Sequence, residues 1–460
     1  MRVRGARSAG LIFLLAALFA APAFATPSLI IDADTGETLY EREATAVWYP
    51  ASLTKLMTVY VALHAVKDGR VTIDTPFVMS ARAASMAPSK MGFPPGAEVT
   101  LDNALKMMMV KSPNDVAVMI AEGVSGSVEA FADEMNAAAA RLGLKESHFV
   151  NPNGLPDARQ VSSARDMAMI GRALYKEFPE EAGIFGIGAL QLGNEIIPTH
   201  NGLIGRYPGA DGMKTGFTCA AGFNVVASAT HNGRRLIVVV LGSPSPRERT
   251  AKAIALFDRG FAQWGGGLGP VADLMPGVGP APDMHQDICS RHNRAALLAA
   301  EEEDMRAAAA PAASSGPLGR GLSLFAALAP QNDPEAMAAM PAPHFDPVPV
   351  FIGPKPGWTG PVAQARPADG QKLFAAPESA SAFAASSDKT GGVGDATPGV
   401  AASAPMALQG AIHPNGKASG LIAPASKATK KLSRIKEMKK GPRVAEPKKP
   451  PAGASPAKTP

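Results

Sequence analysis

The distribution of proline divides this 460-residue chain into two parts. Twenty-seven of the 42 prolines fall between residues 270 and 460, while all five tyrosines lie at or before Tyr207. Beyond Trp264 the sequence consists mainly of Ala, Pro, Gly and Ser with scattered charges. Such a segment buries too little apolar surface to offset the entropy lost on ordering it. We therefore predict one folded unit over 26–265, followed by a mostly disordered tail over 266–460.

The first 25 residues have the pattern of a secretory signal. Arg2, Arg4 and Arg7 precede the apolar run LIFLLAALFAA, and the small-residue motif AFA at 23–25 offers a cleavage site. The apolar run is too short to span a bilayer comfortably. We predict cleavage after Ala25 and an exported protein of the periplasm or cell envelope, either soluble or peripheral to the membrane.

The net charge of +5 arises from the tail. Residues 427–449 contain ten Lys or Arg and two Glu, a local charge of +8, which leaves −3 for the rest of the chain. This distribution does not indicate a globular basic face, and we expect no nucleic-acid partner. Leu432, Ile435 and Met438 form one stripe within the basic segment, so a membrane-binding helix stays open beside the favoured solvated tail. Contact with an anionic wall polymer is a further hypothesis.

The two cysteines, Cys219 and Cys289, exclude a disulfide-dense scaffold. An oxidising compartment would permit one bridge between them, and the sequence leaves that question open. His285, Cys289 and His292 supply three side chains that can ligate a metal, but structural zinc takes four at closer spacing. We predict no metal site and no other cofactor.

Apolar periodicity predicts an α+β unit. The stretch SLIIDADTGETLYER is typical of two strands around a turn, and Asn232-Gly233 is a strong hairpin signal between two later strands. A block of helices followed by three strands and a final helix predicts an antiparallel sheet whose strands come from both ends of the unit. The expected helices cover 52–67, 102–110, 114–123, 127–142, 163–177 and 246–261, and the later strands cover 212–218, 222–230 and 234–242.

Ser52 and Lys55 lie three residues apart at the start of the first expected helix, so they share one face of it. A serine becomes a nucleophile only when a base takes its proton. Lysine can be that base if desolvation or a neighbouring cation lowers its pKa. Taken alone, the pair is more often a capping serine and a solvated lysine.

Two further motifs follow in the chain. Ser112-Pro113-Asn114 lies between two expected helices, where it could simply be a capped turn, and Lys214-Thr215-Gly216 lies on an expected strand, where it could be a kinked edge. Ser-x-x-Lys, Ser-x-Asn and Lys-Thr-Gly, in this order on helix, loop and strand, form the signature of penicillin-binding proteins and serine β-lactamases.

From about Ser28 to Phe261 the chain resembles the low-molecular-mass D-alanyl-D-alanine carboxypeptidases of the S11 peptidase family. The resemblance includes IDADTGETLYE, HFVNPNGLPD and HNGLIGRYPGADGMKTGFT. It implies the two-lobed fold of serine β-lactamases and DD-peptidases, with a five-stranded antiparallel sheet beside a helical lobe. It also implies removal of the terminal D-alanine from peptidoglycan pentapeptide through an acyl-serine intermediate, with β-lactam antibiotics as covalent inhibitors.

The resemblance assigns each motif residue an expected role. The roles are nucleophile for Ser52, base for Lys55, proton relay to the leaving amine for Ser112, substrate holder for Asn114, carboxylate binding for Lys214 and Thr215, close approach of the substrate backbone for Gly216, and oxyanion-hole N–H groups from Ser52 and Phe217.

Other functions remain as alternatives. A class A β-lactamase is disfavoured because Ala132 stands where its deacylating Glu would precede Asn136. A D,D-endopeptidase of the same family, which cleaves peptidoglycan crosslinks, is the main alternative. A non-catalytic wall-binding protein is disfavoured because every catalytic position is filled. We also find no match for the β-sandwich domain that typically follows the catalytic unit in this family.

Overall fold

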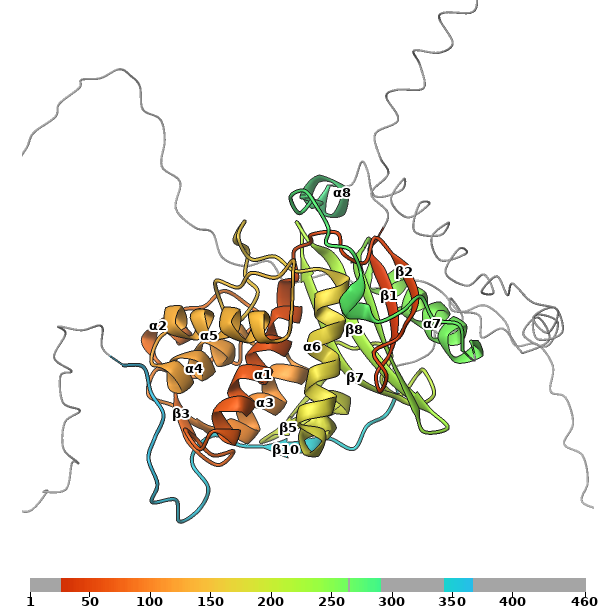
Figure 1. Ribbon diagram of the computed structural model, residues 1–460. Helices are drawn as coiled ribbons and strands as arrows, with labels where there is room; N and C mark the ends of the chain where they lie inside the picture. Colours follow the sequence, from red (N-terminus) through yellow and green to blue (C-terminus); the bar gives the residue numbers. More distant parts are fainter. Residues whose placement is uncertain (1–25, 264, 291–342, 367–460) are drawn as a thin grey trace, which may run out of the picture. The chain divides into compact units, whose positions relative to one another are not determined.

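The structure is a computed structural model that describes residues 26–263, 265–290 and 343–366. The predicted signal at 1–25 and the basic segment at 427–449 lie outside the described residues. A five-stranded antiparallel sheet stands beside a lobe of helices (Figure 1). This arrangement confirms the predicted fold class.

The sheet joins strands from the two ends of the folded unit. β1 pairs with β2 on one side and with β9 on the other, so the first strand lies inside the sheet next to the last. The order is β2-β1-β9-β8-β7, where β7 is an edge strand. The bounds are β1 Ser28–Asp32, β2 Thr38–Arg42, β7 Ala210–Thr218, β8 Gly222–His231 and β9 Arg234–Ser243.

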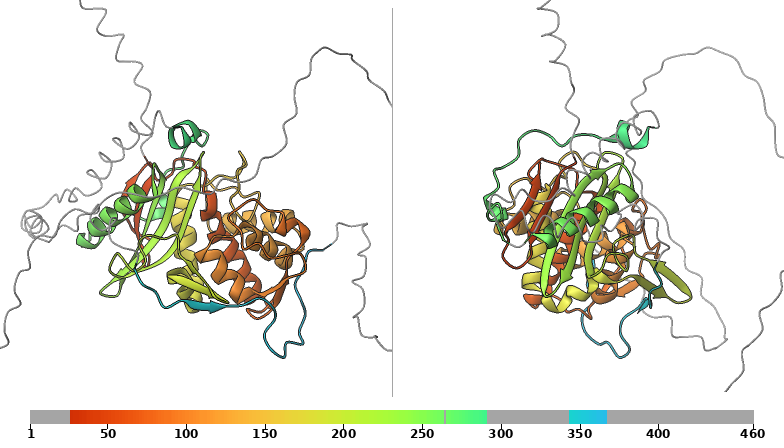
Figure 2. Two further views of the ribbon diagram at one scale, coloured as in Figure 1. Left: turned by 180° about the vertical axis from the view of Figure 1, so that it is seen from behind. Right: turned by 90° about the vertical axis from the view of Figure 1, so that its right-hand side faces the viewer.

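Helices cover both faces of this sheet. Val225 and Val238 belong to the apolar cluster beneath α7 (Pro246–Ala262), while Val226 and Val239 pack with the cluster that contains α6 (Ala164–Glu177). Neighbouring residues of a strand point to opposite faces, so a strand covered on both sides needs a continuous apolar run. Figure 2 shows α7 on one face of the sheet and the helical lobe on the other.

The turn between β8 and β9 confirms the predicted hairpin. Asn232 and Gly233 have φ angles of +51° and +80°. A two-residue hairpin turn of this kind requires positive φ at both positions, which Asn and Gly adopt most readily.

The helical lobe is built around α1, most of whose residues are buried. The predicted helix at 52–67 opens with a 3-10 turn, η2, before α1 begins at Thr54. Side chains of Thr100, Ser127 and Ser163 accept backbone N–H groups at the starts of α3, α5 and α6. The bounds are η2 Ala51–Leu53, α1 Thr54–Lys67, α2 Ala81–Ala84, α3 Leu101–Val110, α4 Asn114–Ser125, α5 Val128–Arg141 and η3 Pro179–Gly186.

Two short antiparallel strand pairs were not predicted, because strands of three or four residues carry too little periodicity to be recognised. One consists of β3 (Pro76–Val78) and β4 (Glu98–Thr100), and the other of β5 (Ala189–Leu192) and β6 (Glu195–Pro198). Within the described parts of the chain, no helix has the length and apolar character needed to cross a membrane.

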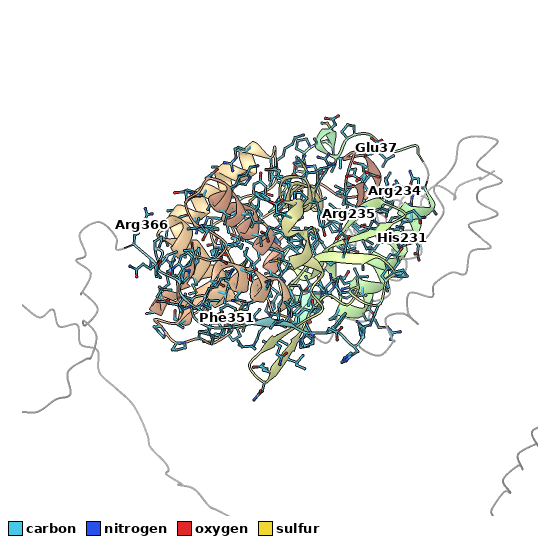
Figure 3. The ribbon with its side chains drawn as sticks, turned by 90° about the horizontal axis from the view of Figure 1, so that it is seen from below. Glu37, His231, Arg234, Arg235, Phe351 and Arg366 are labelled. Atoms are coloured by element: carbon cyan, nitrogen blue, oxygen red, sulfur yellow. A yellow bond between two sulfur atoms is a disulfide. The ribbon has the colours of Figure 1, made fainter. Side chains whose placement is uncertain are left out.

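The structure has further packed elements beyond the predicted end of the folded unit at residue 265. Residues 265–290 contain η4 (Val271–Asp273) and α8 (His285–Cys289), and Met284 and Ile288 are buried there. Farther on, β10 (Val348–Val350) pairs in parallel with β5. Figure 3 shows Phe351 and Arg366, from this last segment, on the side of the helical lobe. A few buried apolar side chains hold these segments against the rest of the fold. The average composition of the segments does not reveal those side chains.

Candidate active site

Ser52 lies in the η2 turn, where β8 fixes the backbone beside it. The buried side-chain amide of Asn224 donates to the carbonyl oxygens of Tyr49 (3.0 Å) and Pro50 (3.3 Å). Ala51 has a φ of +50°, in the left-handed region that costs energy for a residue with a Cβ. Such strain at the residue before a reactive side chain persists only where its surroundings enforce it.

Lys55 is fully buried, and its amine contacts three oxygen atoms. Nζ lies 2.8 Å from Asn114 Oδ1, 2.6 Å from the carbonyl oxygen of Asn153 and 2.9 Å from Ser52 Oγ. Amide and carbonyl oxygens can only accept hydrogen bonds, whereas a hydroxyl can also donate. A neutral amine has two hydrogens and one lone pair. Its hydrogens therefore match the two obligate acceptors, and its lone pair is directed at the hydroxyl of Ser52.

The charges around Lys55 favour this neutral form. Burial, and secondly the charge of Lys214, hold the pKa of Lys55 well below its usual value, and Asp115 opposes the shift only in part. Burial, with Arg249 nearby, lowers the pKa of Lys214 to about 7. Burial also lowers the pKa of Arg249, to about 10. The site thus combines an amine whose neutral form is favoured with neighbouring cationic groups, which suits an anionic ligand.

Ser112 joins α3 to α4 and also has a left-handed backbone, with φ at +62°. Its side chain is buried, and within the described ranges its Oγ makes no hydrogen bond. A buried hydroxyl without a partner loses the free energy of a hydrogen bond, so such a group in a native structure needs an explanation. A substrate atom that completes the bond would supply one.

Asn114 is engaged entirely within the protein. Its side-chain oxygen accepts from Lys55, and its side-chain nitrogen donates to the carbonyls of Ala87 (3.0 Å) and Pro88 (3.2 Å). The structure therefore gives Asn114 a positioning role for Lys55. The expectation that it holds substrate stays a prediction.

Strand β7 carries the third motif along the edge of the sheet. Lys214 and Thr215 are buried, and Nζ of Lys214 donates to the carbonyl of Thr215 at 2.7 Å. Phe217 is 45% exposed and stacks on Phe223, with 4.1 Å between ring centroids. The exposed ring leaves the edge of β7 beside Ser52 open to a ligand.

Gly216 packs closely against the turn that carries Ser52. A Cβ at this position would point at the protein, 3.0 Å from both the carbonyl oxygen of Pro50 and the backbone nitrogen of Ser52. The absence of a side chain therefore lets β7 approach the nucleophile's turn. The expectation that Gly216 also lets the substrate backbone lie against the strand stays a prediction.

The loop that contains Asn153 lies in the stretch HFVNPNGLPD, for which the sequence indicated a family resemblance but no role. The backbone carbonyl of Asn153 accepts a hydrogen bond from Lys55, and the next residue, Gly154, has a φ of +80°. A Cβ on Gly154 would lie 1.8 Å from the carbonyl oxygen of Ala51. Residue type does not reveal a backbone acceptor, so this contact had no sequence signal. Asn224 did have a sequence signal, because it is a polar residue within the apolar run GFNVVASAT.

A cavity of about 240 Å³ opens beside the nucleophile's turn. Ala51 forms one part of its lining, Gly154 to Ala158 form a second, and Thr218 and Ala220 at the end of β7 form a third. On β7 its lining begins at Thr218, after the Lys214-Thr215-Gly216 motif, and on η2 it includes Ala51, the residue before Ser52.

The structure settles the open question about the two cysteines. Cys219 and Cys289 form a disulfide with 5.8 Å between Cα atoms. Cys289 is therefore not available as a thiolate ligand, and His292 lies outside the described residues. Across the described ranges, no group of three or more His, Cys, Asp or Glu side chains is placed to hold a metal ion.

Comparison with known proteins agrees with this geometry. Residues 19–245 match the family described as D-alanyl-D-alanine carboxypeptidase. The carboxypeptidase DacC of Escherichia coli is 37% identical over 273 residues, which are 55% of this chain and 68% of that protein. The chain belongs to the D-alanyl-D-alanine carboxypeptidase family. Within it, DacF of Bacillus subtilis is 36% identical over 52% of this chain and 63% of its own length.

A solved structure of the family has the same architecture. Penicillin-binding protein 5 of Haemophilus influenzae matches 52% of this chain and 71% of its own, at 37% identity and a TM-score of 0.50. The chain spans about three fifths of the length of the first curated family members that it matches.

Proposed function

We propose that this protein is a serine-type D-Ala-D-Ala carboxypeptidase that removes the terminal D-alanine from peptidoglycan pentapeptide. The observation that carries the proposal is the environment of Lys55, whose amine lies 2.9 Å from Ser52 Oγ and 2.8 and 2.6 Å from two oxygens that can only accept. The lowered pKa supports a neutral amine at that position. Family membership supports the choice of substrate.

In the first half-reaction, Ser52 Oγ attacks the carbonyl carbon of the penultimate D-alanine while its proton passes to Lys55 Nζ. Asn114 and Asn153 keep that amine oriented throughout, since each already holds one of its hydrogens. Backbone N–H groups of Ser52 and Phe217 stabilise the oxyanion, typically by about 2.7–4 kcal/mol for one donor.

Collapse of the tetrahedral intermediate breaks the peptide bond and releases D-alanine, whose nitrogen takes a proton through Ser112. The unpartnered hydroxyl of Ser112 supports this role. Water then attacks the acyl-serine ester and gives one proton to Lys55 Nζ, which passes it to the released Ser52 oxygen. Each half-reaction therefore returns Lys55 to its neutral form.

The direction of β7 orders the substrate. Lys214 and Thr215 precede Gly216, so the leaving D-alanine, with its free carboxylate, lies toward the start of the strand. The acyl portion then extends past Phe217 toward Thr218. A buried cationic group beside a nucleophile suits cleavage at the very end of a peptide, where a carboxylate is present.

The same site would accept β-lactam antibiotics, whose strained amide and adjacent carboxylate present similar groups to Ser52 and Lys214. We propose that the protein is exported to the periplasm or cell envelope, where its substrate lies, and the signal pattern at 1–25 supports this. Contact of the basic segment at 427–449 with membrane or wall polymer remains a hypothesis on residues outside those described.

Labelling of the full chain with a fluorescent penicillin tests the catalytic assignment. The wild-type protein should form a stable covalent adduct, and Ser52→Ala should form none. Asn224→Ala offers a useful companion, since it removes the two bonds to the backbone before Ser52 and should slow labelling without abolishing it. Equal labelling of wild type and Ser52→Ala would refute the assignment.

Two substrates then separate the carboxypeptidase from the alternatives. The proposal expects release of D-alanine from a pentapeptide that is faster than cleavage of a crosslinked peptide dimer. The opposite order would indicate a D,D-endopeptidase. Wall binding that depends on the tail, with no reaction on either substrate, would indicate a non-catalytic protein.

A further inference from the structure

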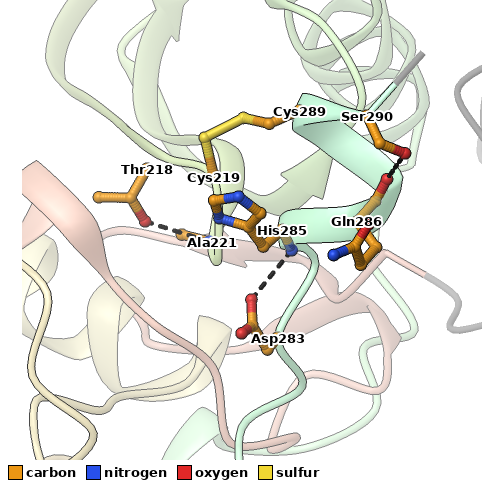
Figure 4. Close-up of a disulfide and its surroundings, with 8 residues drawn as sticks. All are labelled: Thr218, Cys219, Ala221, Asp283, His285, Gln286, Cys289 and Ser290. Atoms are coloured by element: carbon orange, nitrogen blue, oxygen red, sulfur yellow. Dashed lines mark hydrogen bonds between the residues drawn. A yellow bond between two sulfur atoms is a disulfide. The ribbon is translucent and has the colours of Figure 1, made fainter. Parts of the chain in front are cut away.

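The turn between β7 and β8 is held from outside by a disulfide-linked segment. The turn comprises residues 219–221. Cys219 is bonded to Cys289 at the end of α8 (Figure 4). The backbone N–H of Met284, immediately before α8, donates to the carbonyl of Ala220 at 3.1 Å. Two successive residues of the turn are therefore attached to one segment that follows the expected end of the folded unit.

The third residue of the turn is attached to a different element. The indole N–H of Trp48 donates to the carbonyl of Ala221 at 2.9 Å. Trp48 is buried and precedes the nucleophile's turn. Each of the three turn residues is thus bonded to a residue outside the hairpin. A short hairpin turn forms without such bonds.

The attachment by α8 depends on the disulfide. The helix has five residues, and an isolated helix of that length is not stable in water. Its noncovalent anchors include the buried side chains of Met284 and Ile288 and the bond to Ala220. After cleavage of the disulfide, this small segment would separate from the turn more readily, because the bond no longer restricts the segment's conformational freedom.

The turn also contributes to one wall of the cavity beside η2, the turn that carries Ser52. Thr218 and Ala220, on either side of Cys219, line this cavity, and Gly154 to Ala158 face them. Given the direction of the substrate along β7, this is the side that receives the acyl portion of the peptide. Movement of the turn would therefore alter contacts upstream of D-Ala-D-Ala, and it would leave the leaving-group side at Lys214 unchanged.

We propose that the Cys219–Cys289 bond and the segment 284–289 position the acyl-side wall of the active site, so that recognition of the peptide upstream of D-Ala-D-Ala requires the oxidised protein. This inference rests on the proposed carboxypeptidase function. Cys219 and Cys289 act here as positioning residues, since neither takes part in the bond changes at Ser52.

The test compares two peptides on the full chain, before and after reduction with dithiothreitol. Acetyl-D-Ala-D-Ala ends close to the scissile bond, whereas diacetyl-L-Lys-D-Ala-D-Ala extends into the acyl side. Reduction should raise KM for the longer peptide about tenfold, as expected for lost side-chain contacts, with kcat changed by less than about twofold. KM for the short peptide should stay within about twofold, and reoxidation should restore the longer peptide's KM.

A variant with both Cys219→Ser and Cys289→Ser serves as the matched control. Without reductant it should have the KM values of the reduced protein, and dithiothreitol should not change them further. An unchanged KM for the longer peptide after reduction would overturn the proposal. A parallel loss with both peptides would also overturn it, because that result indicates general loosening of the fold. Absence of D-alanine release from both peptides in the oxidised protein would refute the carboxypeptidase function itself.

Discussion

Gly154 packs so tightly against Ala51 that a Cβ on the glycine would lie 1.8 Å from the alanine's carbonyl oxygen. The loop that supplies the Asn153 carbonyl to Lys55 and the turn that carries Ser52 therefore share one contact. A displacement of either backbone moves the nucleophile relative to its base.

We predict that Gly154→Ala slows acylation by penicillin about 100-fold, since a misplacement of about 1 Å in a catalytic group can have that effect. The second-order acylation rate measures it. Gly143→Ala is the matched control, because Gly143 has a similar φ of +69° and a Cβ there would meet no atom of the described residues within 4 Å. Equal acylation rates in the two variants would show that the close contact with Ala51 does not matter for catalysis.

Lys55→Met should lower the acylation rate by about 10²–10⁴-fold, the usual contribution of a general base, while the protein remains folded. Methionine fills the space of the lysine stem and removes a buried amine. Lys252→Met is the matched control, because Lys252 is also fully buried but bonds to Thr26 in a different part of the fold. If Lys252→Met slowed acylation as much as Lys55→Met, loss of a buried lysine would explain the effect better than loss of a base.

Ser112→Ala should slow turnover at least about tenfold with little change in the free energy of unfolding. No partner in the described residues depends on its hydroxyl, so removing it leaves no protein group unsatisfied. Ser163→Ala should behave in the opposite way. It removes the cap of α6 and a bond to Glu146, at a cost of about 1–2 kcal/mol, and should leave turnover unchanged. Urea unfolding and D-alanine release measure the two effects, and a destabilised but fully active Ser112→Ala would contradict the relay role.

The pH dependence of kcat/KM should follow the loss of charge from the Lys214 amine. Its pKa of about 7 means that it loses its charge as the pH rises above 7, and the attraction for the substrate carboxylate weakens. Burial, and secondly the charge of Lys214, hold the pKa of Lys55 well below its usual value. We therefore expect kcat/KM to fall on the alkaline side of about pH 7.

Arg249→Gln should move that alkaline limb to higher pH, because it removes a nearby positive charge that lowers the pKa of Lys214. Arg259→Gln, on the same helix, is the control and should leave the limb in place, since Arg259 packs over the Tyr40 ring. A limb that stays in place, or moves to lower pH, in Arg249→Gln would exclude Lys214 as its source.

Much of the fold could be read from local patterns. The long helices and the three consecutive strands have clear apolar periods, and Asn232-Gly233 marks their hairpin, because these signals depend on nearby residues only. The catalytic triplet was also recognisable, since its residues must keep fixed spacings on their own helix, loop and strand. Short strands such as β5 and the segments beyond residue 265 lacked such signals.

Residue types and their spacing were thus enough to propose the fold class, the nucleophile and its base. The tertiary structure decided what no spacing encodes: which backbone carbonyls hold the Lys55 amine, why Gly216 lacks a side chain, and where Cys289 meets Cys219. These features depend on contacts between residues far apart in the chain. Such contacts form only when the core has packed, because burial then sets both the distances and the low pKa of the lysine.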